Sequence, residues 1–261
     1  MQNRSFASLL AVTSGFALAL LTGCGQVGAP LGVGTALAGN WSFAPATGGV
    51  TLNIGVTQGA YETVSAVGRL SGTSCVSAQT NILLTGSVDS NNDLTLVSSP
   101  FGGTTLTIKG QLAANGLGMA GANWAFAGGS CAALGTANVT ATNYAQIGGT
   151  YQGTFLDASG NQLPVSALLQ QTSQPDGNGQ FSLSGTAEFP SNTCFVQQPS
   201  VTSSLVTGSS LSMTYTDPGS AAVLTAVGSF NSTATQLTIT HWTIAGGACD
   251  GNSGSGSLAL Q

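Results

Sequence analysis

The stretch NWAFAGGSC at residues 123–131 and the stretch HWTIAGGAC at residues 241–249 follow one pattern: a tryptophan, an apolar residue two positions later, a glycine pair and a cysteine. The segments that precede each stretch also recur, since LSGT at 70–73 is found again at 183–186. A chain of 261 residues with this repeat is expected to form two domains, each large enough to enclose its own core. We assign them to 39–145 and 146–261.

Each repeat carries two cysteines at nearly the same spacing. Cys75 lies 56 residues before Cys131, and Cys194 lies 55 residues before Cys249. Equal spacing in the two copies predicts one disulfide within each repeat, Cys75–Cys131 and Cys194–Cys249, and none between the repeats. On the chain-entropy account, closing a loop of this length stabilises a domain by about 4 kcal/mol.

Short segments in which apolar and polar residues alternate fill both repeats, as in strands with one buried face. In VTLNIGVT at 50–57 the four apolar side chains all lie on one face. Clusters of glycine, asparagine and aspartate separate the segments, and no helical period is present. The first repeat is expected to contain a strand that opens at Trp41 and strands over 50–57, 64–71, 82–88, 94–98, 104–112, 118–126 and 134–142.

Eight short strands joined by short turns predict an all-β fold, with two tandem antiparallel meanders that form either eight-stranded barrels or sandwiches. In a meander, the turns after the first, third, fifth and seventh strands share one end. Cys75 follows the third expected strand and Cys131 the seventh, so their bridge is geometrically reasonable. The second repeat keeps the same order, and its insertions, at 174–179 and 187–193, fall in loops.

Charge is scarce, since charged residues make up 4% of the chain and the formal net charge is −5. The three cations are Arg4, Arg69 and Lys109. A nucleic-acid-binding protein, or one held electrostatically on an anionic membrane, requires clustered cations, so both classes are excluded. Glycine, serine, threonine, asparagine and glutamine provide most of the polarity, which predicts a neutral surface.

The first residues are typical of an export signal, with Arg4 followed by an apolar run over 6–21. The run ends at Leu21-Thr22-Gly23-Cys24, which resembles the lipobox of bacterial lipoproteins. The resemblance implies a signal peptide over 1–23, lipidation of Cys24 as the first mature residue, and a flexible tether over 24–38. Gly25 favours sorting to the outer membrane of a Gram-negative bacterium. With Cys24 lipidated, four cysteines remain to pair in an oxidising compartment.

The opening Gly39-Asn40-Trp41 resembles the G-x-W that begins the first strand of lipocalins, of other calycins and of avidin-like proteins. The resemblance implies a closed eight-stranded barrel with a ligand cup. The second repeat departs from it with Gly149-Thr150-Tyr151.

Residues that carry catalytic or metal chemistry are few. His241 is the only histidine, and a polar residue beside the motif tryptophan is enough to explain it. A Ser-His-Asp site would have to be assembled from His241 with an ordinary serine and aspartate. The four cysteines pair and one histidine cannot complete a zinc shell, so we expect no metal site and no cofactor.

The eight carboxylates lie mostly in turn sequences. The segments 89–93 and 176–179 bear a slight similarity to calcium loops but lack the spaced carboxylates of an EF-hand. A glycosidase pair such as Glu62 with Glu188 would require the repeats to meet across a cleft. The carboxylates are Glu62, Asp89, Asp93, Asp157, Asp176, Glu188, Asp217 and Asp250.

The candidate ligand contacts are Trp41, Trp124, Trp242 and His241, although tryptophans of small barrels more often fill the core. Three functions are therefore weighed. The first is a non-catalytic, lipid-anchored envelope protein that binds a small ligand or neutral polymer at a loop rim or barrel cup. The second is a structural or adhesive envelope module without a pocket. The third, a hydrolase, has only His241 and scattered carboxylates to support it. We expect a non-enzyme whose contacts are the membrane, through the anchor, and one unidentified ligand or protein.

Overall fold

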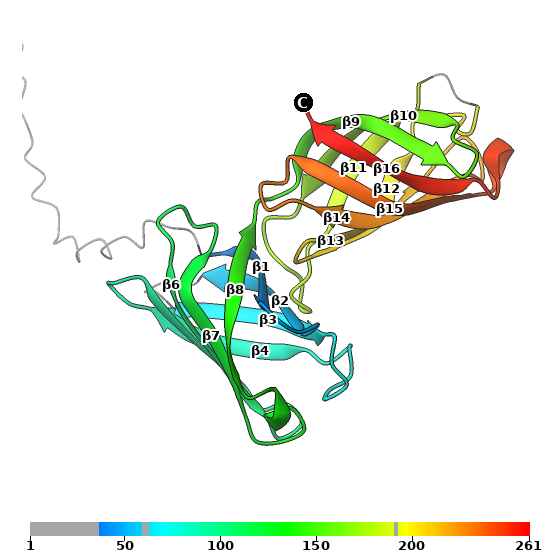
Figure 1. Ribbon diagram of the computed structural model, residues 1–261. Helices are drawn as coiled ribbons and strands as arrows, with labels where there is room; N and C mark the ends of the chain where they lie inside the picture. Colours follow the sequence, from blue (N-terminus) through cyan, green and yellow to red (C-terminus); the bar gives the residue numbers. More distant parts are fainter. Residues whose placement is uncertain (1–36, 59–62, 191–192) are drawn as a thin grey trace, which may run out of the picture.

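A computed structural model of the chain describes residues 37–58, 63–190 and 193–261. In these residues the fold consists of two closed antiparallel barrels, each an eight-stranded meander (Figure 1). The barrel prediction is confirmed, and the sandwich alternative is wrong because the first and last strands of each meander pair with each other. The signal peptide, Cys24 and most of the expected tether lie outside the described residues.

The first barrel follows the strand order that the alternation predicts. Its strands are β1 (Gly39–Pro45), β2 (Thr51–Gln58), β3 (Thr63–Ser71), β4 (Ile82–Val88), β5 (Asp93–Ser98), β6 (Thr105–Leu112), β7 (Met119–Ala127) and β8 (Thr136–Tyr144). A short 3-10 helix, η1 (Ala132–Leu134), lies between the last two. The barrel closes where β1 pairs with β8, from Asn40 opposite Tyr144 to Pro45 opposite Val139.

The second barrel has the same topology. Its strands are β9 (Gly148–Asp157), β10 (Gln162–Gln171), β11 (Leu183–Glu188), β12 (Ser200–Thr207), β13 (Ser210–Thr216), β14 (Val223–Phe230), β15 (Gln236–Ala245) and β16 (Ser253–Leu260). The 3-10 helix η2 (Gly247–Cys249) corresponds to η1. Closure comes from β9 and β16, with Tyr151 opposite Leu260 and Asp157 opposite Gly254.

The duplication includes irregular features of the sheets. In the first barrel the register of β6 with β7 shifts between Lys109 and Gln111, and in the second that of β14 with β15 shifts between Val227 and Gly228. Each shift is a β-bulge that lies just before the motif tryptophan. The two repeats therefore share strand order and also the place where the ladder is broken.

Both disulfides form as the equal spacing predicts. The Cα atoms of Cys75 and Cys131 are 5.0 Å apart, and those of Cys194 and Cys249 are 5.0 Å apart as well. The first cysteine of each pair follows the third strand of its barrel, and the second follows the seventh strand. Each bridge therefore joins two loops at one rim.

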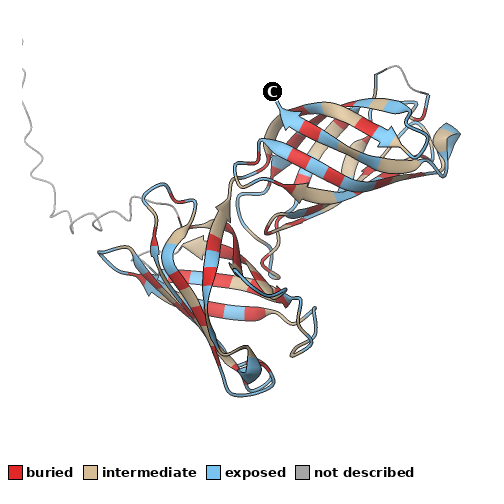
Figure 2. Ribbon diagram, viewed as in Figure 1, coloured by how far each residue is buried: buried red, intermediate tan, exposed pale blue. Residues whose placement is uncertain are grey.

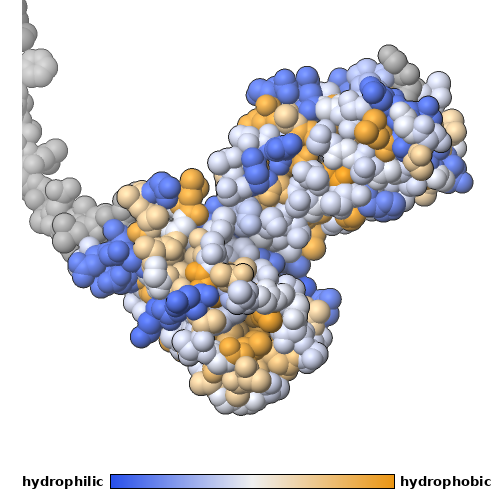
Figure 3. Space-filling model, viewed as in Figure 1, coloured by the Kyte–Doolittle hydropathy of each residue, from blue (hydrophilic) through white to orange (hydrophobic). Residues whose placement is uncertain are grey.

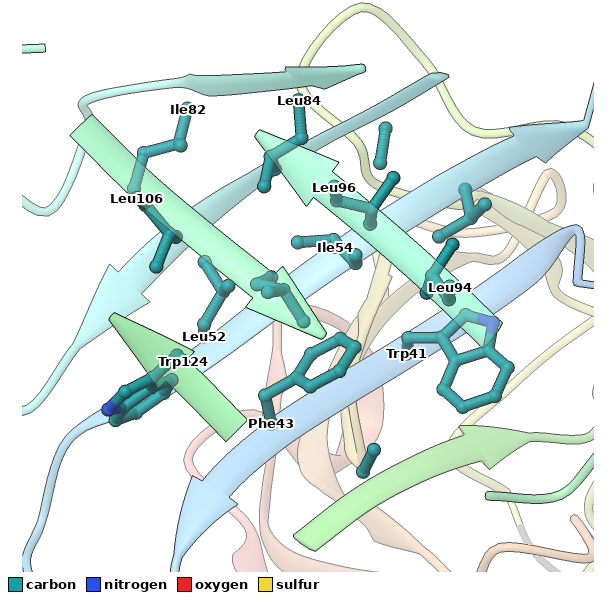
Figure 4. Packing of buried hydrophobic residues seen from close by; sticks show 14 of the residues in the cluster. Trp41, Phe43, Leu52, Ile54, Ile82, Leu84, Leu94, Leu96, Leu106 and Trp124 are labelled. Atoms are coloured by element: carbon teal, nitrogen blue, oxygen red, sulfur yellow. The ribbon is translucent and has the colours of Figure 1, made fainter. Parts of the chain in front are cut away.

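Buried and more exposed residues alternate along many of the strands (Figure 2), as expected when one face of each strand is turned toward a barrel lumen. On β3, for example, Val64, Ala66 and Leu70 are buried, whereas Thr63 and Ser71 are exposed. Trp41 and Phe43 enter the first lumen from β1 and pack among leucines and isoleucines of the facing strands (Figure 4). The lumen of each barrel is thus the hydrophobic core of its domain.

Large rings in the second barrel require small residues opposite them. Phe155 and Trp242 stack with ring centroids 5.7 Å apart and planes 18° apart. Gly256 on β16 lies beside them, and a Cβ atom there would come within 2.7 Å of Phe155 Cδ1. The alternation of serine and glycine in β16 therefore has a simple reason, since the glycines face the aromatic core and the serines face outward.

The barrels are joined by a buried amide pair. The side chain of Asn40 donates from Nδ2 to the carbonyl of Gly208 at 2.7 Å, and the Gly208 N–H donates to Asn40 Oδ1 at 2.7 Å. Gly208 lies in the turn between β12 and β13 with φ of +53°, a conformation that favours glycine. Both backbone hydrogen-bonding groups of Gly208 are satisfied by one side chain, so this contact holds the second barrel in a defined position against β1.

We predict that 39–145 and 146–261 each fold alone. All the strand ladders that close a barrel lie within one repeat, so separation leaves no unpaired sheet edge. Each half, expressed in an oxidising compartment, should be soluble and melt cooperatively with a β-rich circular dichroism spectrum. Halves that stay insoluble apart and fold only when co-expressed would contradict this.

Candidate functional site

The motif tryptophans lie in the core and not at a ligand cup. Trp41, Trp124 and Trp242 are at most 2% exposed. Tyr151, Phe155 and Phe181 in the second barrel are buried to the same degree. Because these side chains fill the lumens, a ligand has no access to the faces of the tryptophan rings, and sites for ligands have to be sought on the outside of the barrels.

The three indole N–H groups differ in their partners. Trp41 Nε1 donates to the carbonyl of Leu37 at 2.8 Å, and Trp242 Nε1 donates to that of Ser255 at 3.2 Å. Trp124 Nε1 is buried and has no acceptor among the described residues. The two motif tryptophans are therefore equivalent in sequence but not in hydrogen bonding.

His241 lies on the outside of the second barrel, at the bulge of β15. It shares a shallow hollow of about 540 Å³ with Asp157, Ser253 and Ser255, so a histidine, a carboxylate and two hydroxyls line one depression. Among the described residues, however, no hydrogen bond joins His241 to any of the three. The residue types of a hydrolytic triad are present without the contacts that activate a nucleophile.

Asp157 is engaged by its own turn. Its Oδ1 accepts from the N–H groups of Ser159 and Asn161, each at 2.8 Å, and its Oδ2 accepts from Asn161 Nδ2 at 2.8 Å. The Asn161 side chain, followed by the backbone N–H groups of the turn, lowers the pKa of this carboxyl. Asp157 thus stabilises a hairpin and is not oriented toward His241.

Other carboxylates repeat this turn. Asp89 Oδ1 accepts from the N–H groups of Asn91 and Asp93 at 2.8 and 2.9 Å, as the turn interpretation of 89–93 expects. In 37–58, 63–190 and 193–261, no three His, Cys, Asp or Glu side chains gather closely enough to hold a metal ion. Glu62 lies outside the described residues, and Glu188 accepts from Gln198 Nε2 at 3.2 Å.

Asp217 has a larger role than a turn sequence alone indicates. It is 1% exposed, and its Oδ2 accepts from the N–H of Val196 and the hydroxyl of Ser220, both at 2.6 Å. Its Oδ1 accepts from the N–H groups of Gly219 at 2.8 Å and Gln197 at 3.1 Å. Asp217 therefore ties the loop after β13 to the loop after β11, at the rim that the Cys194–Cys249 bridge also holds.

Beside this carboxylate, the rim of the second barrel carries an apolar hollow of about 390 Å³. Phe189 and Phe195 stack there with ring centroids 4.5 Å apart, and Val196 is 71% exposed. The hollow forms in the insertion over 187–193 and the residues after it, which the first repeat lacks. The sequence marked this loop as longer but contained no signal that its aromatic rings would pair.

A second hollow, of about 680 Å³, runs over the outer face of β9, β15 and β16. Thr238 lies opposite Ser257, and Ser257 lies opposite Thr154, so one rung across three strands presents three hydroxyl groups. Ser255 and Ser257 line the hollow from β16, the strand that lies between β9 and β15. The lining residues, all uncharged, are Gln152, Gly153, Thr154, Leu156, Gln162, Gln236, Thr238, Ile239, Thr240, Ser255, Gly256, Ser257, Leu258 and Ala259.

The outer-face hollow continues into the depression at His241, because both are lined by Leu156, Thr240 and Ser255. We call the two together the hydroxyl groove. Much of the molecular surface is pale in Figure 3, as expected where serine, threonine and glycine predominate, with hydropathies near zero. His241, a candidate ligand contact from the sequence, lies at one end of the hydroxyl groove.

Comparison of the chain with protein-family models, with curated proteins and with solved structures gives no match. Function therefore has to be argued from the geometry of the barrels alone. Among the described residues, no helix is long and apolar enough to cross a membrane.

We predict that Asp217 makes the stability of the second barrel depend on pH. Burial raises the pKa of this carboxyl, but the Ser220 hydroxyl and three backbone N–H groups outweigh it, and the pKa lies below its ordinary value. Stability gained in this way is fully present above the unfolded-chain pKa, near 3.9, and is lost as the pH falls through the lower folded pKa. Calorimetric melting from pH 7 to pH 2 should show this loss.

The variant Asp217→Asn should melt at a lower temperature at pH 7 and should show a smaller change with pH. Asp157→Asn is the matched control, since Asp157 caps an exposed turn and reaches no second loop. Equal effects of the two substitutions at pH 7 would mean that the link between the loops contributes nothing.

Proposed function

We propose that this protein is a lipid-anchored module of the bacterial cell envelope that binds a neutral, hydroxyl-rich polymer and has no catalytic role. The observation that carries the proposal is the contrast between the filled lumens and the hydroxyl groove, whose outer-face hollow has an uncharged lining. A ligand cup inside a barrel is not part of the proposal, because Trp41, Tyr151 and their neighbours occupy that space.

The anchor and the compartment are supported by the cysteines. Leu21-Thr22-Gly23-Cys24 follows an apolar run and resembles a lipobox, and the other four cysteines form two disulfides. Disulfides persist in oxidising compartments such as the periplasm and the cell surface. Several acyl chains on Cys24 would hold the protein stably on a membrane, where one chain would not. The outer membrane is proposed from Gly25 alone.

The chemistry of the groove favours a polyol. Thr238, Ser257 and Thr154 offer hydroxyl groups that both donate and accept hydrogen bonds, and glutamines at the edge add amides. The outer-face hollow has no charged lining residue, and Asp157 and His241 line only the depression at one end of the groove. An uncharged lining disfavours ionic ligands. The groove is open and follows the strands, so a small molecule would bury little surface, whereas a polymer gains affinity from successive units along it.

The alternative is a structural or adhesive module that uses the apolar rim. Phe189 and Phe195 stack at this rim, and the exposed Val196 lies beside them, as in the centre of many protein contacts. A protein partner would dock there with no requirement for polysaccharide. A hydrolase has less support, because Asp157, which shares the depression with His241, is engaged by its own turn.

We predict that Cys24 is acylated and begins the mature protein. Replacement by serine removes the thiol that a diacylglyceryl group needs, so Cys24→Ser should move the protein from the membrane fraction to the soluble fraction. Labelling with radioactive palmitate should mark the parent protein and not the variant. A variant that stays on the membrane and is processed at the same place would show that the lipoprotein interpretation is wrong.

We predict that filling the groove weakens polymer binding. In Ser257→Ile, a branched apolar side chain replaces a hydroxyl at the middle of the three-strand rung, and binding to insoluble neutral polysaccharides should fall about tenfold, which corresponds to about 1.4 kcal/mol. Both the position and the residue suit an exposed strand, so stability should change by no more than about 0.5 kcal/mol.

Thr140→Ile is the matched control, because Thr140 is exposed on β8, the strand of the first barrel that corresponds to β16. Binding should be measured by co-sedimentation with cellulose, chitin, amylose and cross-linked dextran. If the parent protein sediments with none of these polymers, or if both variants bind as the parent does, the polymer proposal fails.

A further inference from the structure

The barrels meet at a small cleft that is separate from the hydroxyl groove. It has a volume of about 240 Å³ and is lined by both domains. The first barrel contributes Asn53 of β2, Arg69 of β3 and Gln79 of the loop that contains Cys75, and the second contributes Gln180 and Leu205. Loops of the second barrel lie against the side of the first near β1 and β2 (Figure 1).

Arg69 is an unusual residue for this chain, which has only three cations. Its Nε donates to Asn81 Oδ1 at 2.9 Å, and its Nη1 donates to Gln79 Oε1 at 3.1 Å. Both acceptors are neutral, and in the part of the chain that the structure describes no carboxylate forms an ion pair with this guanidinium. The fork formed by Nη1 and Nη2 therefore keeps N–H groups available on a half-buried side chain that lines the cleft.

A relay of amides runs from Arg69 into the second barrel. Asn81 Nδ2 donates to Asn178 Oδ1 at 2.9 Å, and Asn178 Nδ2 donates to Asp176 Oδ2 at 3.3 Å. Asp176 Oδ1 also accepts from the N–H groups of Asn178 and Gln180, at 2.8 and 2.9 Å. Burial raises the pKa of the Asp176 carboxyl, but the hydrogen bonds of its turn and the charge of Arg69 lower it below its ordinary value. The relay thus holds the guanidinium near this carboxylate, although the two groups do not form a direct ion pair.

We propose that this inter-barrel cleft binds a carboxylate-bearing monosaccharide, with Arg69 as the residue that holds the carboxylate. Guanidinium and carboxylate form two parallel hydrogen bonds, for which Nη2 and the second N–H of Nη1 remain. Side-chain amides of Asn53, Gln79 and Gln180 line the rest of the cleft and suit hydroxyl groups, which donate and accept. Sites for drug-sized ligands have volumes of about 300–1,000 Å³, so this smaller cleft fits a single sugar acid.

The site is independent of polymer binding in the hydroxyl groove, because the two share no residue. It joins both domains, since its walls come from strands and loops of each. A ligand that contacts both barrels stabilises their docked arrangement in proportion to its occupancy. We therefore expect the bound sugar acid to raise the melting temperature of the intact chain.

The test is calorimetric titration of the purified full-length protein with glucuronate, and with glucose as the neutral sugar. Glucuronate should bind and glucose should not. Arg69→Gln should lower the affinity at least tenfold, and Arg69→Lys, which keeps the charge but not the fork, should give an intermediate affinity. Lys109→Gln is the matched control: it removes the same charge outside the cleft and should leave binding unchanged.

Arg69 also has a structural role, since it hydrogen-bonds Gln79 and so helps to hold the loop that carries this residue. A second variant distinguishes ligand binding from this structural role. Gln180→Glu adds a carboxylate to the opposite wall with no change in side-chain shape, and it should abolish glucuronate binding while the barrels stay folded. Gln162→Glu adds the same charge at the hydroxyl groove and should have no effect on glucuronate.

The proposal is overturned if the parent protein shows no glucuronate binding up to about 10 mM, tenfold above a Kd of about 1 mM. It is also overturned if glucose binds equally well, or if Gln180→Glu binds glucuronate as the parent does. If Arg69→Gln fails to fold, the comparison of Gln180→Glu with Gln162→Glu decides the question alone.

Discussion

Closure of each meander by its first and last strands is the constraint on which the rest of the structure depends. Because β1 pairs with β8, and β9 with β16, every strand has two neighbours and each sheet has a fixed interior. An eight-stranded barrel has an interior just wide enough for side chains to fill. Trp41, Trp124 and Trp242 are part of that filling, and the serine–glycine alternation of β16 leaves space for the rings.

A filled interior leaves only the outer surfaces open to a ligand, and the two copies differ there more than inside. Each lumen contains the tryptophan that precedes the glycine pair, and in each barrel a disulfide joins two loops at one rim. Their exteriors differ: the second barrel has the hydroxyl groove and an aromatic pair in its longer loop. Core packing constrains the residues that face inward, whereas outward positions tolerate change, so a duplicated domain can diverge in surface while its fold is kept.

Polar contacts join the barrels at their junction, where Tyr144 also packs edge-on against Phe230 of the second barrel. The Asn40 side chain pairs with the backbone N–H and C=O of Gly208. The amide relay from Arg69 to Asp176 is a second set of hydrogen bonds that links the barrels. Buried polar groups that are fully paired specify one arrangement, because any displacement leaves them unsatisfied. The contacts that orient the domains thus also form the walls of a cleft that contains a guanidinium without a direct ion-pair partner in the described structure.

The sequence by itself determined the strands, the duplication and the disulfides. Strand alternation has a period of two residues and equal cysteine spacing is visible in a linear chain, so both are local signals or simple counts. Closure was not determined, because barrel and sandwich share the same local pattern and differ only in whether strands about a hundred residues apart pair. The Arg69 cleft was also invisible, since Asn81 and Asn178 are 97 residues apart and come together only when the barrels dock. The hydrogen bonding of Trp124 and Trp242 could not be predicted either, because the two sequence motifs match. In the described structure only Trp242 of these two has an acceptor for its indole N–H, and that acceptor belongs to the backbone of another strand.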